Sequence, residues 1–129
     1  MVYIADTHAL IWFLTDSKKL GPNAQELFKK AELGETIIII STISLMEILY
    51  ICKKENRVNQ FKDILKKLKI SLNYLTFDLD LETVLECVNL EKVNEMHDRI
   101  IVATAKIANA KIITKDLNII KSNYTKIIW

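Results

Sequence analysis

The chain has 129 residues, of which half are apolar and about a quarter are charged, a size and composition that suit one folded domain. This composition excludes a disordered chain, a collagen-like repeat and a low-complexity scaffold, and two glycines and one proline are too few for the turns of an all-β sandwich. The net charge of +2 allows a phosphate-bearing partner without requiring one. We expect a single domain over residues 1–129.

Short apolar runs alternate with longer amphipathic stretches, which predicts strands alternating with helices. The clearest strand is the run of four isoleucines at 37–40, because β-branched residues favour strands. The predicted strands are Val2–Ala5, Ile37–Ile40, Leu72–Phe77, Lys111–Thr114 and Lys126–Trp129. In the first half of the chain, helices are predicted over Thr7–Leu14, from Asn23 to Leu33 after the Gly21-Pro22 break, and over Ser44–Lys54 and Val58–Lys69. In the second half, helices are predicted over Leu81–Leu90 (N-capped by Asp80) and Asp98–Ala108, and a helical stretch from Leu117.

The expected strands are continuous apolar runs, and most of them lead into a helix. This pattern is typical of a parallel sheet that is covered on both faces. We therefore predict the α/β class, as a three-layer α/β/α sandwich around a five-stranded parallel sheet. Sheets of this kind place their sites beyond the carboxyl ends of the strands.

No segment is predicted to enter a membrane. The N-terminal stretch 1–14 has no positive region and contains Asp6, so it does not resemble a signal peptide. The most apolar stretch, 36–52, contains Glu47, and an acid at mid-membrane costs about 3 kcal/mol. Cys52 and Cys87 match neither a disulfide framework nor a zinc site, so we expect reduced core cysteines and a cytoplasmic protein.

Four acids are expected near one edge of the sheet. Asp6 directly follows the first strand, Glu47 lies in the first turn of the helix after the second strand, and Asp116 follows the fourth strand. Asp98 opens the helix that leads into the fourth strand. It reaches the same edge only if the loop 92–97 crosses the top of the sheet.

Four carboxylates within about 5 to 6 Å would repel one another by roughly 3 kcal/mol for each pair at an effective dielectric constant near 20. Either several of them are protonated or a divalent cation lies between them. Oxygen ligands favour Mg²⁺ or Mn²⁺ over zinc. Such an ion suits phosphoryl chemistry, because it activates water and stabilises charge on phosphate oxygens.

Each acid also has a purely structural interpretation. Asp6 and Asp98 are possible N-caps of the helices that they precede, and Asp116 is a possible turn residue. Ser44 and Glu47 have the spacing of a capping box. A cap and a metal ligand are compatible roles, and Glu47 is the one charge in an otherwise uncharged stretch, which favours a functional role.

Four sequence blocks resemble those of PIN-domain proteins. The opening 4–12, IADTHALIW, is similar to an Asp-Thr-His-x-Leu-Leu-Trp motif, and 43–48, ISLMEI, is similar to Ser-x-x-Glu-Ile. Residues 97–105, HDRIIVATA, resemble an Asp-Arg-x-x-x-Ala block, and 113–116, ITKD, resembles a Thr-x-Asp element. Each block is weak by itself, but the set occurs in family order along the whole chain and is highly specific.

The resemblance implies a sheet of order 3-2-1-4-5 and a Mg²⁺- or Mn²⁺-dependent endoribonuclease. For a small single-domain chain it implies a VapC-like toxin of a type II toxin–antitoxin pair, with an RNA substrate and a cognate antitoxin as partners. The positions that match the catalytic and metal-site acids of the family are Asp6, Glu47, Asp98 and Asp116, and those that match the supporting hydroxyls are Thr7 and Thr114. The resemblance also implies that the loop before Asp98 makes the crossing.

Several other residues are weaker candidates. His8 and His97 adjoin the acids, and we interpret them as surface or packing residues, with RNA contact or leaving-group protonation as the alternative. Arg99 is expected to brace a neighbouring carboxylate, with phosphate binding as its alternative. The lysines at 62, 66 and 69 are expected to form a solvated face rather than an RNA track.

The predicted helix 44–54 is apolar on two sides. One side, with Leu45 and Ile48, is expected to pack on the sheet. The other, with Ile43, Tyr50 and Ile51, is expected to contribute to a homodimer or to a groove for the antitoxin, unless it is simply buried interior.

Two alternative functions remain open. A phosphatase or a receiver domain has a similar architecture, but His8 stands where the phosphatase motif has a second Asp, and Asp6 lacks the paired acid of a receiver domain. A PIN-type RNA- or protein-binding module without catalysis is the closer alternative.

Overall fold

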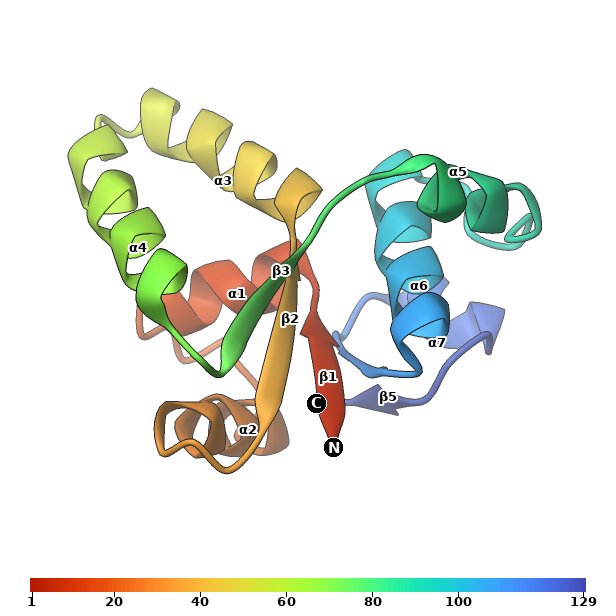
Figure 1. Cartoon of the computed structure of the whole chain (residues 1–129), viewed down its shortest axis with the longest axis horizontal. Coiled ribbons are helices and arrows are strands. Elements are labelled where there is room, and N and C mark those ends of the chain that lie inside the picture. The colour runs from red at the N-terminus through yellow and green to blue at the C-terminus, as the bar shows by residue number, and fades with distance from the viewer.

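The computed structural model describes residues 1–129 and contains one five-stranded, entirely parallel sheet with the order β3-β2-β1-β4-β5 (Figure 1). The predicted sheet and its order are therefore confirmed. The strands are β1 (Val2–Ala5), β2 (Ile37–Ser41), β3 (Tyr74–Phe77), β4 (Lys111–Ile113) and β5 (Ile127–Ile128).

The sheet has a core on each face, which explains why its strands are apolar throughout. Successive side chains of a strand point to opposite faces. Tyr3 and Ala5 of β1 accordingly join one buried cluster, while Ile4 between them joins the other. A strand at the centre of such a sheet has no solvent-facing side, so an alternating polar pattern is absent.

The helices form a layer on each side of the sheet, as the predicted three-layer sandwich requires (Figure 1). One core cluster includes residues from the helices α1 (Thr7–Leu14), α2 (Pro22–Glu32), α3 (Thr42–Lys54) and α4 (Val58–Ile70). The other lies beneath α5 (Leu81–Val88), α6 (Met96–Ala108) and α7 (Leu117–Ser122).

Two helices begin two residues earlier than the sequence predicts, because a better-placed cap precedes each of them. α3 begins at Thr42, where the Ser41 hydroxyl accepts the Ile43 N–H at 3.3 Å. α6 begins at Met96, where the Glu95 carboxylate accepts the Asp98 N–H at 2.7 Å. The predicted cap of α5 is confirmed. β3 starts two residues after the predicted start, at Tyr74.

Both cysteines are free thiols, but neither is a fully buried core residue, so the sequence expectation is wrong on this point. Cys52 is half-buried against the cluster under α1–α4, and Cys87 is half-buried against the cluster under α6. The two thiols therefore belong to opposite faces of the sheet. No helix combines the length and the apolar character needed to cross a bilayer.

Candidate functional site

Asp6 lies where β1 ends and α1 begins, and it is only 6% exposed. One carboxylate oxygen accepts the Ala9 N–H at 2.7 Å, so Asp6 is the N-cap of α1, as one interpretation of the sequence predicts. The other oxygen accepts a hydrogen bond from the Thr114 hydroxyl. Burial raises the pKa of Asp6 above its ordinary value, although both hydrogen bonds act to lower it.

Thr114 connects Asp6 to Asp116. The Thr114 hydroxyl donates to Asp6 and accepts the backbone N–H of Asp116 at 3.0 Å. Asp116 in turn uses Oδ1 to accept the N–H groups of Asn118 and Ile119, at 2.9 and 3.1 Å, and so caps α7. The Oδ2 atom of Asp116 accepts no hydrogen bond from the protein.

Glu47 lies in the second turn of α3, not in the first turn, and it does not form a capping box with Ser44. Both expectations fail because α3 begins at Thr42, which places Ser44 inside the helix, fully buried. The Thr7 hydroxyl lies 2.8 Å from Glu47 Oε1 and 3.0 Å from Ser44 Oγ. Because an ionised carboxylate only accepts, Thr7 donates to Glu47.

Asp98 is half-buried in the first turn of α6 and lies close enough to the other acids for their charges to act on it. It is not the N-cap, because Glu95 has that role. Burial first, and then the negative charges of Asp116, Glu95, Asp6 and Glu47, raise the pKa of Asp98 to about 6. The loop before α6 therefore does carry Asp98 to the edge where β1 and β4 end. Figure 1 shows α3 and α6 on either side of that edge.

The acidic cluster of Asp6, Glu47, Asp98 and Asp116 has no cationic partner in the protein. None of the four forms an ion pair with a lysine, an arginine or a histidine. A group of carboxylates whose negative charge no side chain balances, and whose ligand atoms are all oxygen, is chemically suited to a hard divalent cation. In the present arrangement no three acidic side chains converge on one point at coordination distance, so coordination of one ion by three of them requires side-chain rotation.

Glu95 is a site residue that the sequence reasoning missed. Its two oxygens accept the Asp98 N–H and contact His97 Nδ1, both at 2.7 Å, so it fixes the turn that presents Asp98. Burial acts to raise the pKa of Glu95, but these bonds hold it below its ordinary value. The spacing of three residues before Asp98 is the signal of an N-cap, although Glu is a poor capping residue and is easily passed over.

Arg99 does not brace a carboxylate, contrary to the prediction. Its Nε donates to the Val93 carbonyl at 2.7 Å, and its Nη1 donates to the Cys87 carbonyl at 3.4 Å. These carbonyls lie at the end of α5 and in the loop that follows it, and the Cys87 carbonyl also accepts the Leu90 N–H at 3.1 Å. Arg99 therefore fixes the loop that leads to Asp98.

The other weak candidates are at the periphery. His97 is partly exposed and its pKa is raised, first by its bond to Glu95. His8 is exposed and lies against the ring of Trp12, with 5.6 Å between centroids. The lysines at 62, 66 and 69 are all exposed on α4, in agreement with a solvated face.

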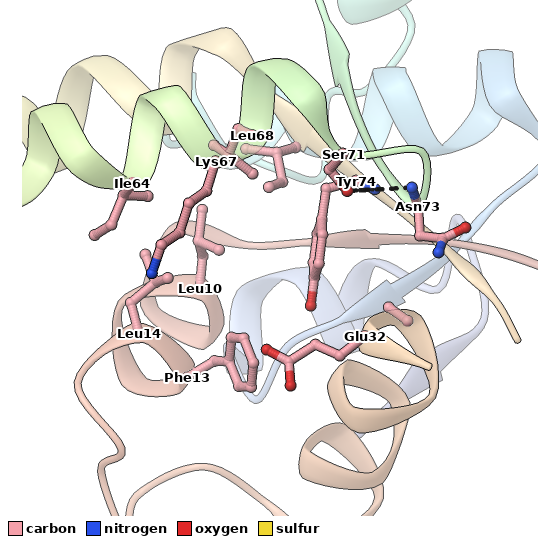
Figure 2. A pocket seen from close by; sticks show the side chains of 12 residues that line it. Leu10, Phe13, Leu14, Glu32, Ile64, Lys67, Leu68, Ser71, Asn73 and Tyr74 are labelled. Carbon is pink, nitrogen blue, oxygen red and sulfur yellow. Dashed lines mark hydrogen bonds between the residues drawn. The ribbon is translucent and has the colours of Figure 1, made fainter. Parts of the chain in front are cut away.

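A second feature is an apolar groove that contains none of the four acids. A pocket of about 430 Å³ lies between α1, α4 and the end of α2, and Figure 2 shows Leu10, Phe13 and Leu14 facing Ile64 and Leu68 across it. A neighbouring pocket of about 380 Å³ shares Leu14, Ile64 and Lys67 with the first and continues to α3.

The outer side of α3 is partly exposed. The alternative that this side of the helix is simply buried interior is therefore wrong. Tyr50 is 59% and Met46 is 48% exposed, so these residues are not buried interior. Ile51, on the same helix, lines the apolar groove.

Comparison with known proteins gives a consistent picture of the fold. The family model of the PIN domain matches residues 3–122. VapBC2 from Rickettsia felis, solved bound to a promoter DNA fragment, is 18% identical with a TM-score of 0.74, over 99% of this chain and 98% of that chain. A toxin–antitoxin complex from Klebsiella pneumoniae is 20% identical with a TM-score of 0.72, over 98% and 96%. DNA-bound VapBC from Salmonella typhimurium is 15% identical with a TM-score of 0.74, over 99% and 97%. No curated protein sequence matches the chain.

Proposed function

Because the chain belongs to the PIN domain family, we propose that it is a Mg²⁺- or Mn²⁺-dependent endoribonuclease and the toxin of a type II toxin–antitoxin pair. The observation that carries the proposal is the acidic cluster. Four carboxylates from distant parts of the chain share one edge of the sheet and form no ion pair with a cationic side chain. Burial, and then the neighbouring negative charges, raise the pKa of Asp98 to about 6. The toxin–antitoxin complexes of similar fold support the choice of a toxin.

In this proposal Asp6, Glu47, Asp98 and Asp116 hold the ion, directly or through water. When bound, Mg²⁺ or Mn²⁺ supplies an activated water and stabilises negative charge on the scissile phosphate. The protein's own contribution is positioning. Thr114 and the Ala9 N–H fix the two oxygens of Asp6, and Thr7 fixes one oxygen of Glu47. Hydrolysis is expected to leave 5′-phosphate and 3′-hydroxyl ends.

The proposed activity is tested by incubating the purified chain with structured and unstructured RNAs. We expect cleavage with Mg²⁺ or Mn²⁺ and none with EDTA. Without the ion, the carboxylates cannot activate a water or stabilise the negative charge on the phosphate oxygens. Either ion should also raise the melting temperature, because a ligand that binds only the folded state stabilises it. RNA that is bound but left intact with both ions would instead favour the catalytically silent RNA-binding module.

We also propose that the apolar groove receives the cognate antitoxin. Leu14 lies where the two pockets meet and is 36% exposed, so Leu14→Glu places a charge in the groove without disturbing the buried core. We expect at least about a tenfold loss of antitoxin affinity, the cost of a desolvated charge, with RNA cleavage unchanged. Calorimetry with the antitoxin measures the loss.

The matched control for the groove is Leu33→Glu. Leu33 is 74% exposed at the end of α2 and lines neither pocket. Equal affinities of the Leu14→Glu variant and the wild type would place the antitoxin elsewhere.

Two further expectations from the sequence remain proposals, namely a homodimer and a cytoplasmic location. Support for self-association comes from exposed apolar side chains on α5, where Leu81, Leu85 and Val88 are 61–73% exposed. Light scattering that gives the mass of one chain at high concentration would contradict the dimer. The free thiols are consistent with a reducing compartment.

A further inference from the structure

A cluster of aromatic and cationic side chains lies beside the acidic cluster. Trp12 and Trp129 meet edge to face, with 5.8 Å between ring centroids. The Lys115 ammonium lies 4.7 Å from the Trp12 centroid and 5.9 Å from that of Trp129, and the Lys19 ammonium lies 5.9 Å from Trp12. We refer to His8, Trp12, Lys19, Lys115 and Trp129 as the tryptophan–lysine cluster.

Two segments of the chain contribute residues to both clusters. His8 is two residues after Asp6 in the first turn of α1, and its ring centroid lies 5.6 Å from that of Trp12. Lys115 stands between Thr114 and Asp116 in the turn that follows β4. A polymer that places one of its bonds at the acidic cluster therefore has its neighbouring units beside these residues.

Both lysines of the cluster are free of carboxylate partners. Lys115 adjoins Asp116 in sequence, yet it forms no ion pair with it or with any other acid. Its ammonium lies over the tryptophan rings instead, and both Lys115 and Lys19 are exposed. A cation held on an aromatic face keeps its full charge and remains available to an anion.

The rings themselves are held in place by the fold. Trp129 fits against Gly21, where a Cβ atom would come within 2.5 Å of the indole, and its carbonyl accepts a hydrogen bond from Asn23 at 2.8 Å. Trp12 lies on α1, whose start is capped by Asp6. Both indoles are partly exposed, so the cluster offers a fixed aromatic surface to solvent.

We propose that the tryptophan–lysine cluster binds the single-stranded RNA segment next to the cleaved bond, with a base stacked on Trp12 and Lys115 in contact with an adjacent phosphate. The inference rests on the proposed ribonuclease function and names the contacts that hold its substrate. Stacking on an aromatic ring accepts any base, and lysine contacts follow the backbone. The cluster therefore contributes affinity and register rather than sequence choice.

The test uses the protein's own fluorescence, because its two tryptophans are both members of the cluster. A single-stranded oligoribonucleotide is titrated into the whole chain with EDTA present, so that no cleavage occurs. We expect saturable quenching. Lys115→Ala should weaken binding about fivefold, and Trp12→Leu about tenfold or more, the usual range for loss of a phosphate contact and of one stacked base.

The matched control is Lys66→Ala, which removes an exposed lysine of α4 that has no carboxylate partner and should change the affinity less than twofold. Trp12→Phe keeps an aromatic face and should retain most of the affinity, which separates stacking from a folding defect. The inference is overturned if RNA binds without quenching, or if Lys115→Ala and Lys66→Ala bind equally well. Saturable quenching without any cleavage in Mg²⁺ would leave the RNA-binding surface intact and refute only the nuclease.

Discussion

Asp98→Asn should abolish RNA cleavage and, in the absence of metal, make the protein more stable. The loss of activity follows because an amide does not supply the charge that holds a divalent cation. We expect a decrease larger than the 10–100-fold typical of residues that only orient a ligand, so more than about a hundredfold. Far-UV circular dichroism should remain unchanged, because the Asp98 side chain caps no helix.

The gain in stability follows from the sign of the Asp98 pKa shift. The pKa is about 6 in the folded protein against an ordinary value of 3.8, so folding favours the protonated form. The ionised carboxylate therefore destabilises the fold. This penalty is absent below about pH 4, grows between pH 4 and 6, and is complete above pH 6. At pH 7 Asp98→Asn should add about 1 kcal/mol after allowance for screening of a half-exposed group, or about 3–6 °C in melting temperature.

Thermal melts in EDTA at pH 7 and pH 4 measure this effect. The difference between Asp98→Asn and the wild type should be positive at pH 7 and should vanish near pH 4. Asp78→Asn is the control, because Asp78 is an exposed acid after β3 and lies outside the acidic cluster. Equal melting temperatures for the wild type and Asp98→Asn at pH 7 would mean that the neighbouring acids do not destabilise ionised Asp98. Cleavage by Asp98→Asn at the wild-type rate would mean that Asp98 does not hold the metal ion.

The elements and the parallel sheet could be predicted because their determinants are local, whereas the strand order was implied only by the family resemblance. Four consecutive isoleucines at 37–40 suit only a strand with both faces buried, and the strand 2–5 is equally apolar. The ends of these runs mark the carboxyl edge of the sheet, which is why Asp6 and Asp116 could be placed at one site. The capping role of Asp6 was also readable, because Asp is a favoured N-cap. Asp116 was interpreted as a turn residue, and the structure shows that it caps α7.

The remaining parts of the site depend on geometry that the sequence does not encode locally. Ser44 and Glu47 have the right spacing for a capping box, but the N-cap is Ser41 at the end of β2, three residues before Ser44. Arg99 is long enough to reach either a carboxylate or a carbonyl, and only the fold of the loop 89–95 decides between them. The position of Asp98 required a loop to cross the sheet edge, which the family resemblance, rather than periodicity, implied.

Thr114→Val should uncouple Asp6 from Asp116 and lower both activity and stability. The Thr114 hydroxyl is fully buried, donates to Asp6 and accepts the Asp116 N–H. Valine has nearly the same shape but can do neither, so it leaves a buried carboxylate oxygen and a backbone N–H without partners. We expect a loss of about 1–3 kcal/mol in the free energy of unfolding. Cleavage should fall about 10- to 100-fold, as for other residues that orient a metal ligand.

Two further variants separate positioning from packing. Thr114→Ser keeps the hydroxyl and should restore kcat/KM to within about threefold of the wild type, since the lost methyl group takes no part in either hydrogen bond. Thr104→Val removes a hydroxyl that is equally buried but donates to the Ile100 carbonyl within α6. It should change kcat/KM little, whatever it does to stability. If Thr104→Val and Thr114→Val reduce kcat/KM equally, Thr114 acts through general stability and does not position Asp6.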